Sequence, residues 1–372
     1  MSARFLTVVL ERVFNMRDGF GREIDYMRIS VIDSCNLNCY YCNPCDNNEH
    51  CHALNILSVK EVLCIVRAAT RLGITHFRLT GGEPLLHPQL DEMVLQIKKI
   101  PGVSSVSLTT NAVLLAQHAK WLKEAGIDSI NVSLDTIDAS EYERITKKPL
   151  LEEVKHGINA AIECGIRVKI NVVLTPQTDV VALTRYASKK GTDIRFIEMM
   201  PVGEGHTNGV EPYEKVIGAL LEVYGTPCHI DTENREEINS GYNNADNGPA
   251  EYYSFHGLNI RVGLIQAIHG KFCDTCNRIR VTADGRLMPC LGSSVTMDLV
   301  PDSCEFTDDL EKDFVIVQAL KAAIKAKPGC HNFNDNAVTY TKTTETKTVE
   351  TKTTELKAAE VNAARNMSRI GG

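Results

Sequence analysis

Residues 28–42 read RISVIDSCNLNCYYC, a β-branched run that leads directly into three cysteines. The CxxxCxxC spacing puts the thiols of Cys35, Cys39 and Cys42 on one loop after a predicted strand. Soft thiolates favour iron–sulfur clusters, zinc or Cu(I), and three of them are one fewer than a closed site with four cysteine ligands uses. A metal centre held here keeps one position free for substrate or cofactor, so we expect a catalytic iron centre.

A fourth thiol from the same loop is the alternative. If Cys45 or Cys51 completed the set, the centre would be closed and would serve structure or electron transfer. The bacterial ferredoxin spacing is not matched, because Cys51 follows Cys45 at the wrong distance. We therefore expect the open centre with three thiols.

Cys273, Cys276 and Cys290 form a second group of three thiols, which a predicted hairpin turning at residues 283–285 would bring to one point. Cys304 lies as far beyond Cys290 as Cys290 lies beyond Cys276, so a zinc ribbon with four cysteine ligands is the alternative here. The chain has 13 cysteines, an odd number that a fully disulfide-paired secreted protein would avoid. Metal or cluster ligation is therefore the leading explanation of the cysteine content.

The composition is that of an ordinary globular protein. Of the 372 residues, 43% are hydrophobic and 23% are charged, which excludes collagen-like, wholly disordered and multi-span membrane classes. The net charge of −7 provides no general attraction for nucleic acid or anionic lipid. No apolar run approaches the roughly 18 residues that a membrane-spanning helix needs, and the run at residues 5–10 is interpreted as a strand. We expect a cytoplasmic protein without nucleic-acid or membrane partners.

Residues 28–200 alternate short β-rich runs with amphipathic helical stretches, the pattern of βα units around a parallel sheet. The predicted strands are Arg28–Ile32, Ile74–Thr80, Val103–Thr109, Ile127–Leu134, Ile166–Val173 and Ile194–Met199. Six units are too few for a closed eight-stranded barrel, so we favour a partial (βα)6 TIM-type barrel over an open doubly wound sheet. We expect this α/β barrel over residues 1–200, a smaller C-terminal module over residues 201–335 and a flexible tail over residues 336–372.

Polar or glycine residues stand at the end of every predicted strand, where α/β barrels place their ligand sites. Gly81-Gly82-Glu83-Pro84 follows the second strand, where glycines allow close backbone approach and Glu83 can accept from an amine. The later strands bring Thr109, Asn111, Ser133, Asp135, Lys169, Asn171, Arg195, Glu198 and Met200. We expect these groups on one rim. A local basic set suited to a polyphosphate adds to them: Arg22, Arg78, Arg278 and Arg280.

The CxxxCxxC loop and the Gly81-Gly82-Glu83-Pro84 segment together resemble the radical S-adenosylmethionine (SAM) superfamily. Other motifs resemble the MoaA family, the GTP 3′,8-cyclases of molybdenum cofactor biosynthesis. These motifs are Gly21-Arg22, Arg195–Glu198, the second cysteine group with Asn277-Arg278-Ile279-Arg280, and the terminal Gly371-Gly372. The resemblance covers nearly all of residues 14–335 and the last few residues. It implies a lyase with a partial barrel of the radical SAM type and a C-terminal iron–sulfur module.

The resemblance implies a [4Fe–4S] cluster on Cys35, Cys39 and Cys42, whose open iron binds SAM. Reductive cleavage of SAM then yields a 5′-deoxyadenosyl radical. The residues that match the family's SAM contacts are Tyr41, Gly82, Ser133 and Met200, with Glu83 and Asn111 nearby.

The resemblance also implies a second [4Fe–4S] cluster on Cys273, Cys276 and Cys290, with GTP instead of Cys304 at its open iron. The radical would take the ribose 3′ hydrogen, and attack on guanine C8 would give 3′,8-cyclo-7,8-dihydroguanosine 5′-triphosphate. The implied partners are cyclic pyranopterin monophosphate synthase downstream and a low-potential electron donor, with a homodimer as one arrangement of the chain. The positions that match GTP contacts are Arg22, Arg78, Thr109, Lys169, Arg195, Arg278, Ile279 and Arg280.

Three features depart from the family pattern. His76 stands where the family has a lysine near the triphosphate, which would weaken that contact. Ala112 stands where glycine is usual, which matters only if this backbone needs a positive φ. The Thr/Lys/Glu repeat of residues 341–355 predicts a solvated tether that lengthens the reach of Gly371 and Gly372, which in the family enter the active site. Longer loops cost little, so we expect activity to be retained.

Two other functions fit parts of this pattern. A different radical SAM enzyme with an auxiliary cluster, such as a peptide-modifying maturase, would share both cysteine groups but not Asn277–Arg280 or the Gly-Gly end. A zinc-binding interaction protein would use both cysteine groups structurally, but it leaves the glycine-rich end of strand two and the basic set unexplained.

Overall fold

The computed structural model describes most of the chain. The described residues are 16–42, 55–202, 210–230, 248–293, 295–299, 309–331 and 333. The predicted strand at residues 5–10 and the tail over residues 336–372 lie outside them, as do Cys45, Cys51 and Cys304. Within the described part of the chain, no helix is both long and apolar enough to span a membrane.

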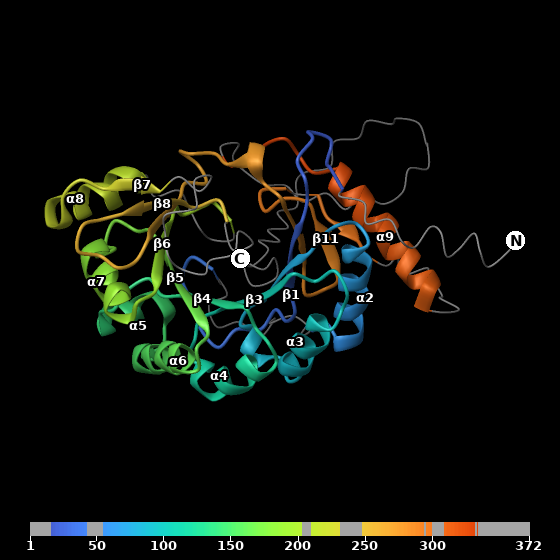
Figure 1. The fold of residues 1–372 in the computed structure, drawn as a ribbon, viewed down its shortest axis with the longest axis horizontal. Coiled ribbons are helices and arrows are strands. Elements are labelled where there is room, and N and C mark those ends of the chain that lie inside the picture. Colours follow the sequence, from blue (N-terminus) through green and yellow to red (C-terminus); the bar gives the residue numbers. More distant parts are fainter. Residues whose placement is uncertain are drawn as a thin grey trace, which may run out of the picture.

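Six parallel strands form the centre of the molecule and lie side by side in the order of the sequence. They are β1 (Tyr26–Ser30), β2 (His76–Thr80), β3 (Ser105–Thr110), β4 (Ser129–Ser133), β5 (Arg167–Val173) and β6 (Asp193–Ile197). Each overlaps the run predicted for it, so the six predicted strands are confirmed. In Figure 1 the strands curve into an arch with helices on its outside, which is the partial barrel expected from the sequence.

Helices follow the strands and cover the outside of the arch (Figure 1). They are α2 (Val59–Thr70), α3 (Leu90–Lys98), α4 (Leu115–Glu124), α5 (Ala139–Thr146), α6 (Leu151–Glu163) and α7 (Val180–Lys190), with the short 3-10 helix η1 (Pro84–Leu86) after β2. α2 begins at a capping box, in which the Ser58 hydroxyl accepts from the Glu61 amide and the Glu61 carboxylate accepts from the Ser58 amide. The cap satisfies backbone donors that the first turn of a helix otherwise leaves open.

Side-chain alternation along the strands separates an apolar outer face from a polar inner face. On β1, Met27 and Ile29 are buried in the hydrophobic core, whereas Tyr26 and Arg28 line the interior. The same alternation on the other strands turns these polar groups inward: Arg78, Thr80, Thr109, Asn131, Ser133, Asn171 and Arg195. The arch therefore encloses a cavity with these polar side chains on its wall, where a closed eight-stranded barrel is filled by layers of apolar side chains.

The C-terminal residues extend the same sheet at both edges. β9 (Val262–Ile265) pairs parallel with β6, and β10 (Arg278–Val281) pairs parallel with β1. β10 and β11 (Arg286–Met288) are antiparallel neighbours and form the predicted hairpin. The sheet continues to β12 (Met297–Asp298) on one side and to β8 (Glu251–Ser254) and β7 (Cys228–Ile230) on the other. Because β10 lies beside β1, the second cysteine group is attached next to the first strand of the barrel.

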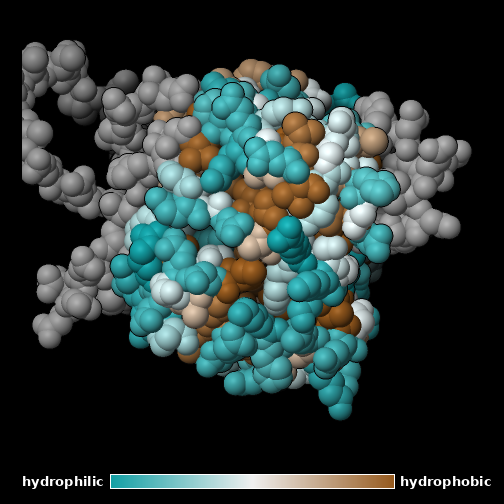
Figure 2. Space-filling model, turned by 90° about the vertical axis from the view of Figure 1, so that its left-hand side faces the viewer, coloured by the Kyte–Doolittle hydropathy of each residue, from teal (hydrophilic) through white to brown (hydrophobic). Residues whose placement is uncertain are grey.

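Three further helical elements flank this extension. A π-helical turn at Tyr213–Ile217 runs into α8 (Gly218–Tyr224). α9 (Asp309–Lys325) packs beside α2, and Arg71 Nη2 lies 3.0 Å from Asp313 Oδ2 between them. Figure 2 shows the side of the molecule that carries α7 and α8, where hydrophobic patches lie between hydrophilic residues.

Candidate active site

One cavity inside the barrel reaches both cysteine groups. Its lining includes Cys35, Cys39 and Cys42 as well as Cys273, Cys276 and Cys290, and the inner faces of the parallel strands lie between them. The polar groups that end the strands were expected on one rim, and this expectation is wrong for two of the cations. Lys169 and Arg195 lie inside β5 and β6, as Arg78 of the basic set lies inside β2, because polar residues occupy the inner face of the strands and not only their ends.

The first cysteine loop is held by the backbone that follows β2. The Gly82 amide donates to the Ile32 carbonyl at 2.8 Å, and the Glu83 amide donates to the Ser34 carbonyl at 2.8 Å. A β-carbon on Gly82 would stand 2.1 Å from the Ser34 oxygen, and one on Gly81 would stand 2.3 Å from the Ile32 oxygen. Only glycine fits at both positions, so the close backbone approach predicted from the sequence is confirmed.

Glu83 is completely buried and orients Asn111. Its carboxylate accepts hydrogen bonds from the Thr110 hydroxyl at 2.7 Å, the Asn111 amide at 2.7 Å and the Leu85 amide at 3.0 Å. Burial raises the pKa of Glu83 to about 7. The Asn111 side chain donates to the Asn36 side-chain oxygen at 2.7 Å and lies 3.8 Å from Cys35 Sγ. Asn111 thus lines the cavity, whereas Glu83 is buried outside the cavity lining and holds the backbone of Asn111 in place.

Tyr41 ties the same loop to the other side of the barrel. Its hydroxyl donates to Asp135, which also accepts from the Val173 amide at 2.8 Å. Burial raises the pKa of Asp135 to about 6. The Asn38 amide donates to the Thr146 carbonyl at the end of α5 at 3.0 Å. The three thiols are therefore presented by a loop that is hydrogen-bonded on both sides.

The surroundings of the first group favour the neutral thiol form of its cysteines. Burial raises the pKa of Cys35 to about 11 and the pKa of Cys39 well above its ordinary value. Bound iron would reverse this preference, because a metal ligates and stabilises the thiolate form. Among the residues that the structure describes, no three His, Cys, Asp or Glu side chains converge as they would on a single ion. The cysteines of a [4Fe–4S] cluster bind different irons and need not converge that closely.

The second group is built around the β10–β11 hairpin. Cys273 opens the short 3-10 helix η4 (Cys273–Thr275), Cys276 precedes β10, and Cys290 follows β11. Burial by itself would raise the pKa of Cys276, but the positive charges of Lys327 and Arg278 bring it below its ordinary value. Burial raises the pKa of Cys290. This group therefore lies in a more electropositive environment than the first.

Arginines form the wall between the two groups. Arg280 on β10, Arg28 on β1 and Arg78 on β2 occupy one register row across three adjacent strands. Burial, followed by repulsion from Arg280, lowers the pKa of Arg28, and burial with repulsion from Arg278 lowers the pKa of Arg280 to about 10. Arg195 adds a guanidinium from β6. A row of buried positive charges attracts an anion, and the fork geometry of guanidinium suits phosphate.

Tyr26 and Arg28 are site residues that the sequence reasoning missed. Arg78 Nε donates to the Tyr26 hydroxyl, and the guanidinium carbons of Arg78 and Arg278 lie 5.9 and 5.8 Å from the Tyr26 ring centre. The alternation of polar and apolar residues from Tyr26 to Ser30 was the available signal, because it places Tyr26 and Arg28 on one face. Lys327, which also lines the cavity, had no such signal.

Polar atoms in the cavity wall fit a polar ligand. Thr109 Oγ1, Asn131 Oδ1 and Arg195 Nη2 are buried and have no hydrogen-bond partner among the described residues. Buried polar atoms without partners are costly, so their presence in one cavity indicates groups that a ligand satisfies. Ser133, Met200 and Gly82 also line the cavity, as expected of SAM-contacting residues.

Several predicted ligand contacts lie off the described cavity lining. The guanidinium of Arg22 is bound by Asp18 and by backbone carbonyls, and Glu83 is covered by its three donors. Ile279 is 1% exposed and packs in the hydrophobic core, on the face of β10 opposite to Arg278 and Arg280. Lys169 is 1% exposed and lies on the inner face of β5, two residues before Asn171. Gly371 and Gly372 lie outside the described residues.

The structure clarifies two of the departures. His76 Nδ1 lies 3.0 Å from the Ser105 hydroxyl at the start of β2 and does not belong to the described cavity lining. Ala112 has φ of 64°, so the backbone here does need the left-handed conformation that glycine adopts most easily. The Ala112 methyl group is fully buried in the hydrophobic core, which offsets part of that strain.

Two family profiles match the chain in succession. The profile described as "Radical SAM superfamily" matches residues 29–183, and the profile described as "Molybdenum Cofactor Synthesis C" matches residues 192–333. Among the curated relatives, a "GTP 3′,8-cyclase" of Clostridium perfringens (strain SM101 / Type A) is 36% identical over 86% of this chain and 95% of the relative. Another, of Listeria monocytogenes serovar 1/2a (strain ATCC BAA-679 / EGD-e), is 36% identical over 85% of this chain and 92% of the relative.

Among solved structures, Streptococcus suis SuiB bound to S-adenosylmethionine has the same fold, with a TM-score of 0.53 and 15% sequence identity. The match covers 80% of this chain and 65% of SuiB, so the chain spans just under two thirds of that protein. At this identity the likeness concerns the fold alone.

Proposed function

Because this chain belongs to the GTP 3′,8-cyclase family within the radical SAM superfamily, we propose that it converts GTP to 3′,8-cyclo-7,8-dihydroguanosine 5′-triphosphate, the first step of molybdenum cofactor biosynthesis. One observation carries the proposal. A single cavity is lined by two groups of three cysteines, with a row of arginines along the wall between them. A zinc-binding interaction protein has no need of that row, and a peptide-modifying enzyme has no need of so many phosphate-binding groups.

Cys35, Cys39 and Cys42 line the cavity together and would hold the first [4Fe–4S] cluster, which would bind SAM. When bound, this pair supplies a 5′-deoxyadenosyl radical after the arrival of one electron. Asn111 and Tyr41 fix the loop from opposite sides, and Gly82 lets the end of β2 approach it. Ser133 and Met200 line the same cavity, which supports a role for them in contacting the adenosyl and methionine parts of SAM.

Cys273, Cys276 and Cys290 line the same cavity and would hold the second [4Fe–4S] cluster, at which the guanine of GTP would bind. Arg28, Arg78, Arg195, Arg278 and Arg280 bind the triphosphate and exclude water from it. The unpartnered hydroxyl of Thr109 supports a role for this residue in orienting the ribose. Such contacts would present the 3′ carbon of the ribose toward Cys35, Cys39 and Cys42.

Arg22, Lys169 and Ile279 keep a supporting part in this proposal. Arg22 holds the second cysteine loop through a hydrogen bond to the Cys273 carbonyl. Lys169 lies on β5 two residues before Asn171. Ile279 contributes backbone and core packing between Arg278 and Arg280.

The remaining expectations belong to the same proposal. Residues 1–200 form the radical SAM barrel, residues 201–335 carry the second cluster, and residues 336–372 deliver Gly371 and Gly372 to the cavity. The product passes to cyclic pyranopterin monophosphate synthase, and a low-potential donor supplies the electron. The reaction takes place in the cytoplasm, in a monomer or a homodimer.

The test is turnover by the anaerobically reconstituted protein with SAM and a low-potential reductant. With GTP we expect 5′-deoxyadenosine and cyclised nucleotide in equal amounts by mass spectrometry, and with ATP we expect no cyclised nucleotide. SAM cleavage without GTP consumption would reject the substrate, and a zinc-containing protein without either product would reject the enzyme.

A further inference from the structure

Lys327 is a buried lysine beside the second cysteine group. It follows α9 and is 2% exposed. Its ammonium donates to the Arg278 carbonyl at 2.7 Å and to the Pro289 carbonyl at 3.1 Å, and Nζ lies 3.4 Å from Cys276 Sγ. An ammonium group has three donors, and here each has an acceptor, so the charged form is compatible with burial.

The two carbonyls belong to the two sides of the hairpin that carries the cysteines. Arg278 is the first residue of β10, shortly after Cys276, and Pro289 directly precedes Cys290. One ammonium group therefore bridges the chain next to both cysteines. Any movement of either strand relative to the other would break one of its hydrogen bonds.

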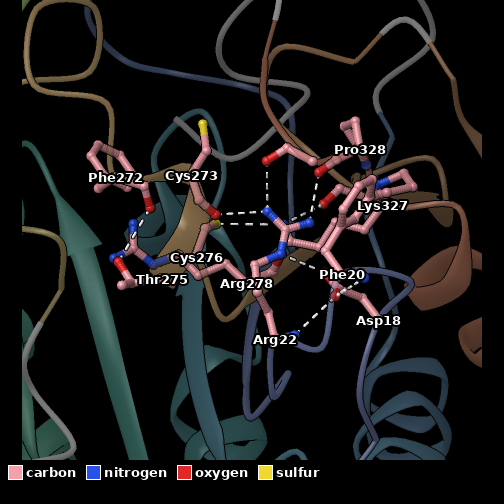
Figure 3. Close-up of polar contacts among 12 residues, drawn as sticks. Asp18, Phe20, Arg22, Phe272, Cys273, Thr275, Cys276, Arg278, Lys327 and Pro328 are labelled. Atoms are coloured by element: carbon pink, nitrogen blue, oxygen red, sulfur yellow. Dashed lines mark hydrogen bonds and ion pairs between the residues drawn. The ribbon is translucent and has the colours of Figure 1, made fainter.

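Hydrogen bonds through Arg22 also connect the backbone after Lys327 to Cys273, the remaining cysteine of the second group (Figure 3). Arg22 Nη2 donates to the Pro328 carbonyl at 2.6 Å, and Arg22 Nη1 donates to the Gly329 carbonyl at 3.1 Å and to the Cys273 carbonyl at 2.7 Å. Asp18 accepts from Arg22 Nε at 2.6 Å. The residues after Lys327 are thus clamped to the loop that begins with Cys273, which gives the ammonium a single position.

The charge of Lys327 also lies next to the cysteines. Its Nζ atom is 3.4 Å from Cys276 Sγ, and the two carbonyls that it contacts belong to Arg278 and Pro289, beside Cys276 and Cys290. A positive charge next to an iron–sulfur cluster stabilises the more negative, reduced form, which raises the reduction potential.

We propose that Lys327 is a positioning residue for the second cluster, which bridges both sides of the cysteine hairpin and keeps the reduction potential of that cluster higher than a neutral side chain would. The proposal rests on the proposed function, because it assumes that Cys273, Cys276 and Cys290 hold a cluster. It adds a role for a residue outside the cysteine motif. The role lies in the charge of Lys327 and not merely in the space that its side chain fills.

The test compares Lys327→Met, which keeps the length of the side chain and removes its charge, with Lys327→Arg, which keeps the charge. Lys325→Met is the matched control, because Lys325 is exposed at the end of α9. All are made in the full chain and in a background with Cys35, Cys39 and Cys42 changed to Ala, so that the second cluster is measured alone. The readouts are iron content per chain and the midpoint potential from a redox titration followed by electron paramagnetic resonance.

We expect Lys327→Met to lower the midpoint potential of the second cluster or to lose that cluster while the first is kept. Lys327→Arg should restore potential or occupancy toward the wild type, and Lys325→Met should match the wild type. A wild-type potential in Lys327→Met overturns the proposal. Equal loss of the second cluster in the Met and Arg variants also overturns it, because the shape of the lysine side chain, and not its charge, would then matter. Loss of both clusters in Lys327→Met overturns it as well, because the residue would then be needed for folding of the whole chain. A wild-type chain that holds only the first cluster contradicts the proposed function instead, and is recognised before any variant is made.

Discussion

Gly82 lies so close to Ser34 that a β-carbon on Gly82 would stand 2.1 Å from the Ser34 carbonyl oxygen. The approach is backbone to backbone, since the Gly82 amide donates to the Ile32 carbonyl and the Glu83 amide donates to the Ser34 carbonyl. These bonds continue the pairing of β1 with β2 up to the first cysteine. The position of Cys35 therefore depends on the absence of a side chain at Gly82.

Gly82→Ala should displace this loop and lose the first cluster while the second is kept. Backbone cannot give way as a flexible side chain can, so we expect about half of the wild-type iron after reconstitution. Gly218→Ala is the control, because Gly218 is helical and has nothing within 4 Å of an added β-carbon. Full iron content in Gly82→Ala would show that the loop is not held by this contact.

Glu83 should make the stability of the protein fall as the pH rises. Burial raises its pKa from the ordinary 4.5 to about 7, so the folded state binds the proton more tightly than the unfolded state does. The stabilising contribution is complete below about pH 4.5 and is lost as the pH rises toward 7, by roughly 3 kcal/mol. Glu83→Gln should be less stable overall but should show a flatter pH dependence. Urea denaturation at about pH 5 and about pH 7.5 measures how much the free energy of unfolding changes with pH in each protein. The same change in the wild type and in Glu83→Gln would contradict this account.

Arg195→Lys should weaken GTP binding. Arg195 Nε donates to Asn171 Oδ1 at 2.9 Å, and its Nη2 atom is buried in the cavity wall without a hydrogen-bond partner among the described residues. Lysine keeps the charge but loses the second donor of the fork, so we expect an affinity loss of about ten- to a hundredfold by calorimetry. Arg185→Lys, on the exposed face of α7, should bind GTP as the wild type does. Unchanged affinity in Arg195→Lys would remove this residue from the phosphate site.

Deletion of Gly371 and Gly372 should abolish cyclisation and leave both clusters in place. Residues without a β-carbon fit where side chains would not, which is the reason for a Gly-Gly end in a confined active site. Iron content and cyclised nucleotide are measured on the same preparation. Full activity of the shortened chain would exclude the tail from the reaction.

The sequence predicted the local parts of this architecture well. The six strands could be recognised because β-branched runs and amphipathic helices alternate, and the hairpin at β10–β11 because its turn residues are local. The need for glycine at Gly82 could be inferred because the motif lies directly after a strand. In each case the signal lies within a short stretch of chain.

The contacts that could not be predicted join residues far apart in the chain. Arg22 was expected at the triphosphate, but Asp18, Cys273 and Gly329 bind its guanidinium, and the last two are carbonyl contacts that no sequence pattern marks. Lys327 reaches the second cysteine group because α9 brings the chain back beside it. The parallel pairing of β10 with β1 aligns Arg280 with Arg28 and Arg78 in one row inside the barrel, and no local pattern predicts that pairing.

The central claim is that one cavity lets a radical formed at the first cysteine group act on GTP held at the second. The most direct test is turnover with GTP deuterated at the ribose 3′ carbon, followed by mass spectrometry of the 5′-deoxyadenosine. The account predicts one deuterium in 5′-deoxyadenosine and a cyclised nucleotide without it. Unlabelled 5′-deoxyadenosine with intact, fully labelled GTP would contradict it.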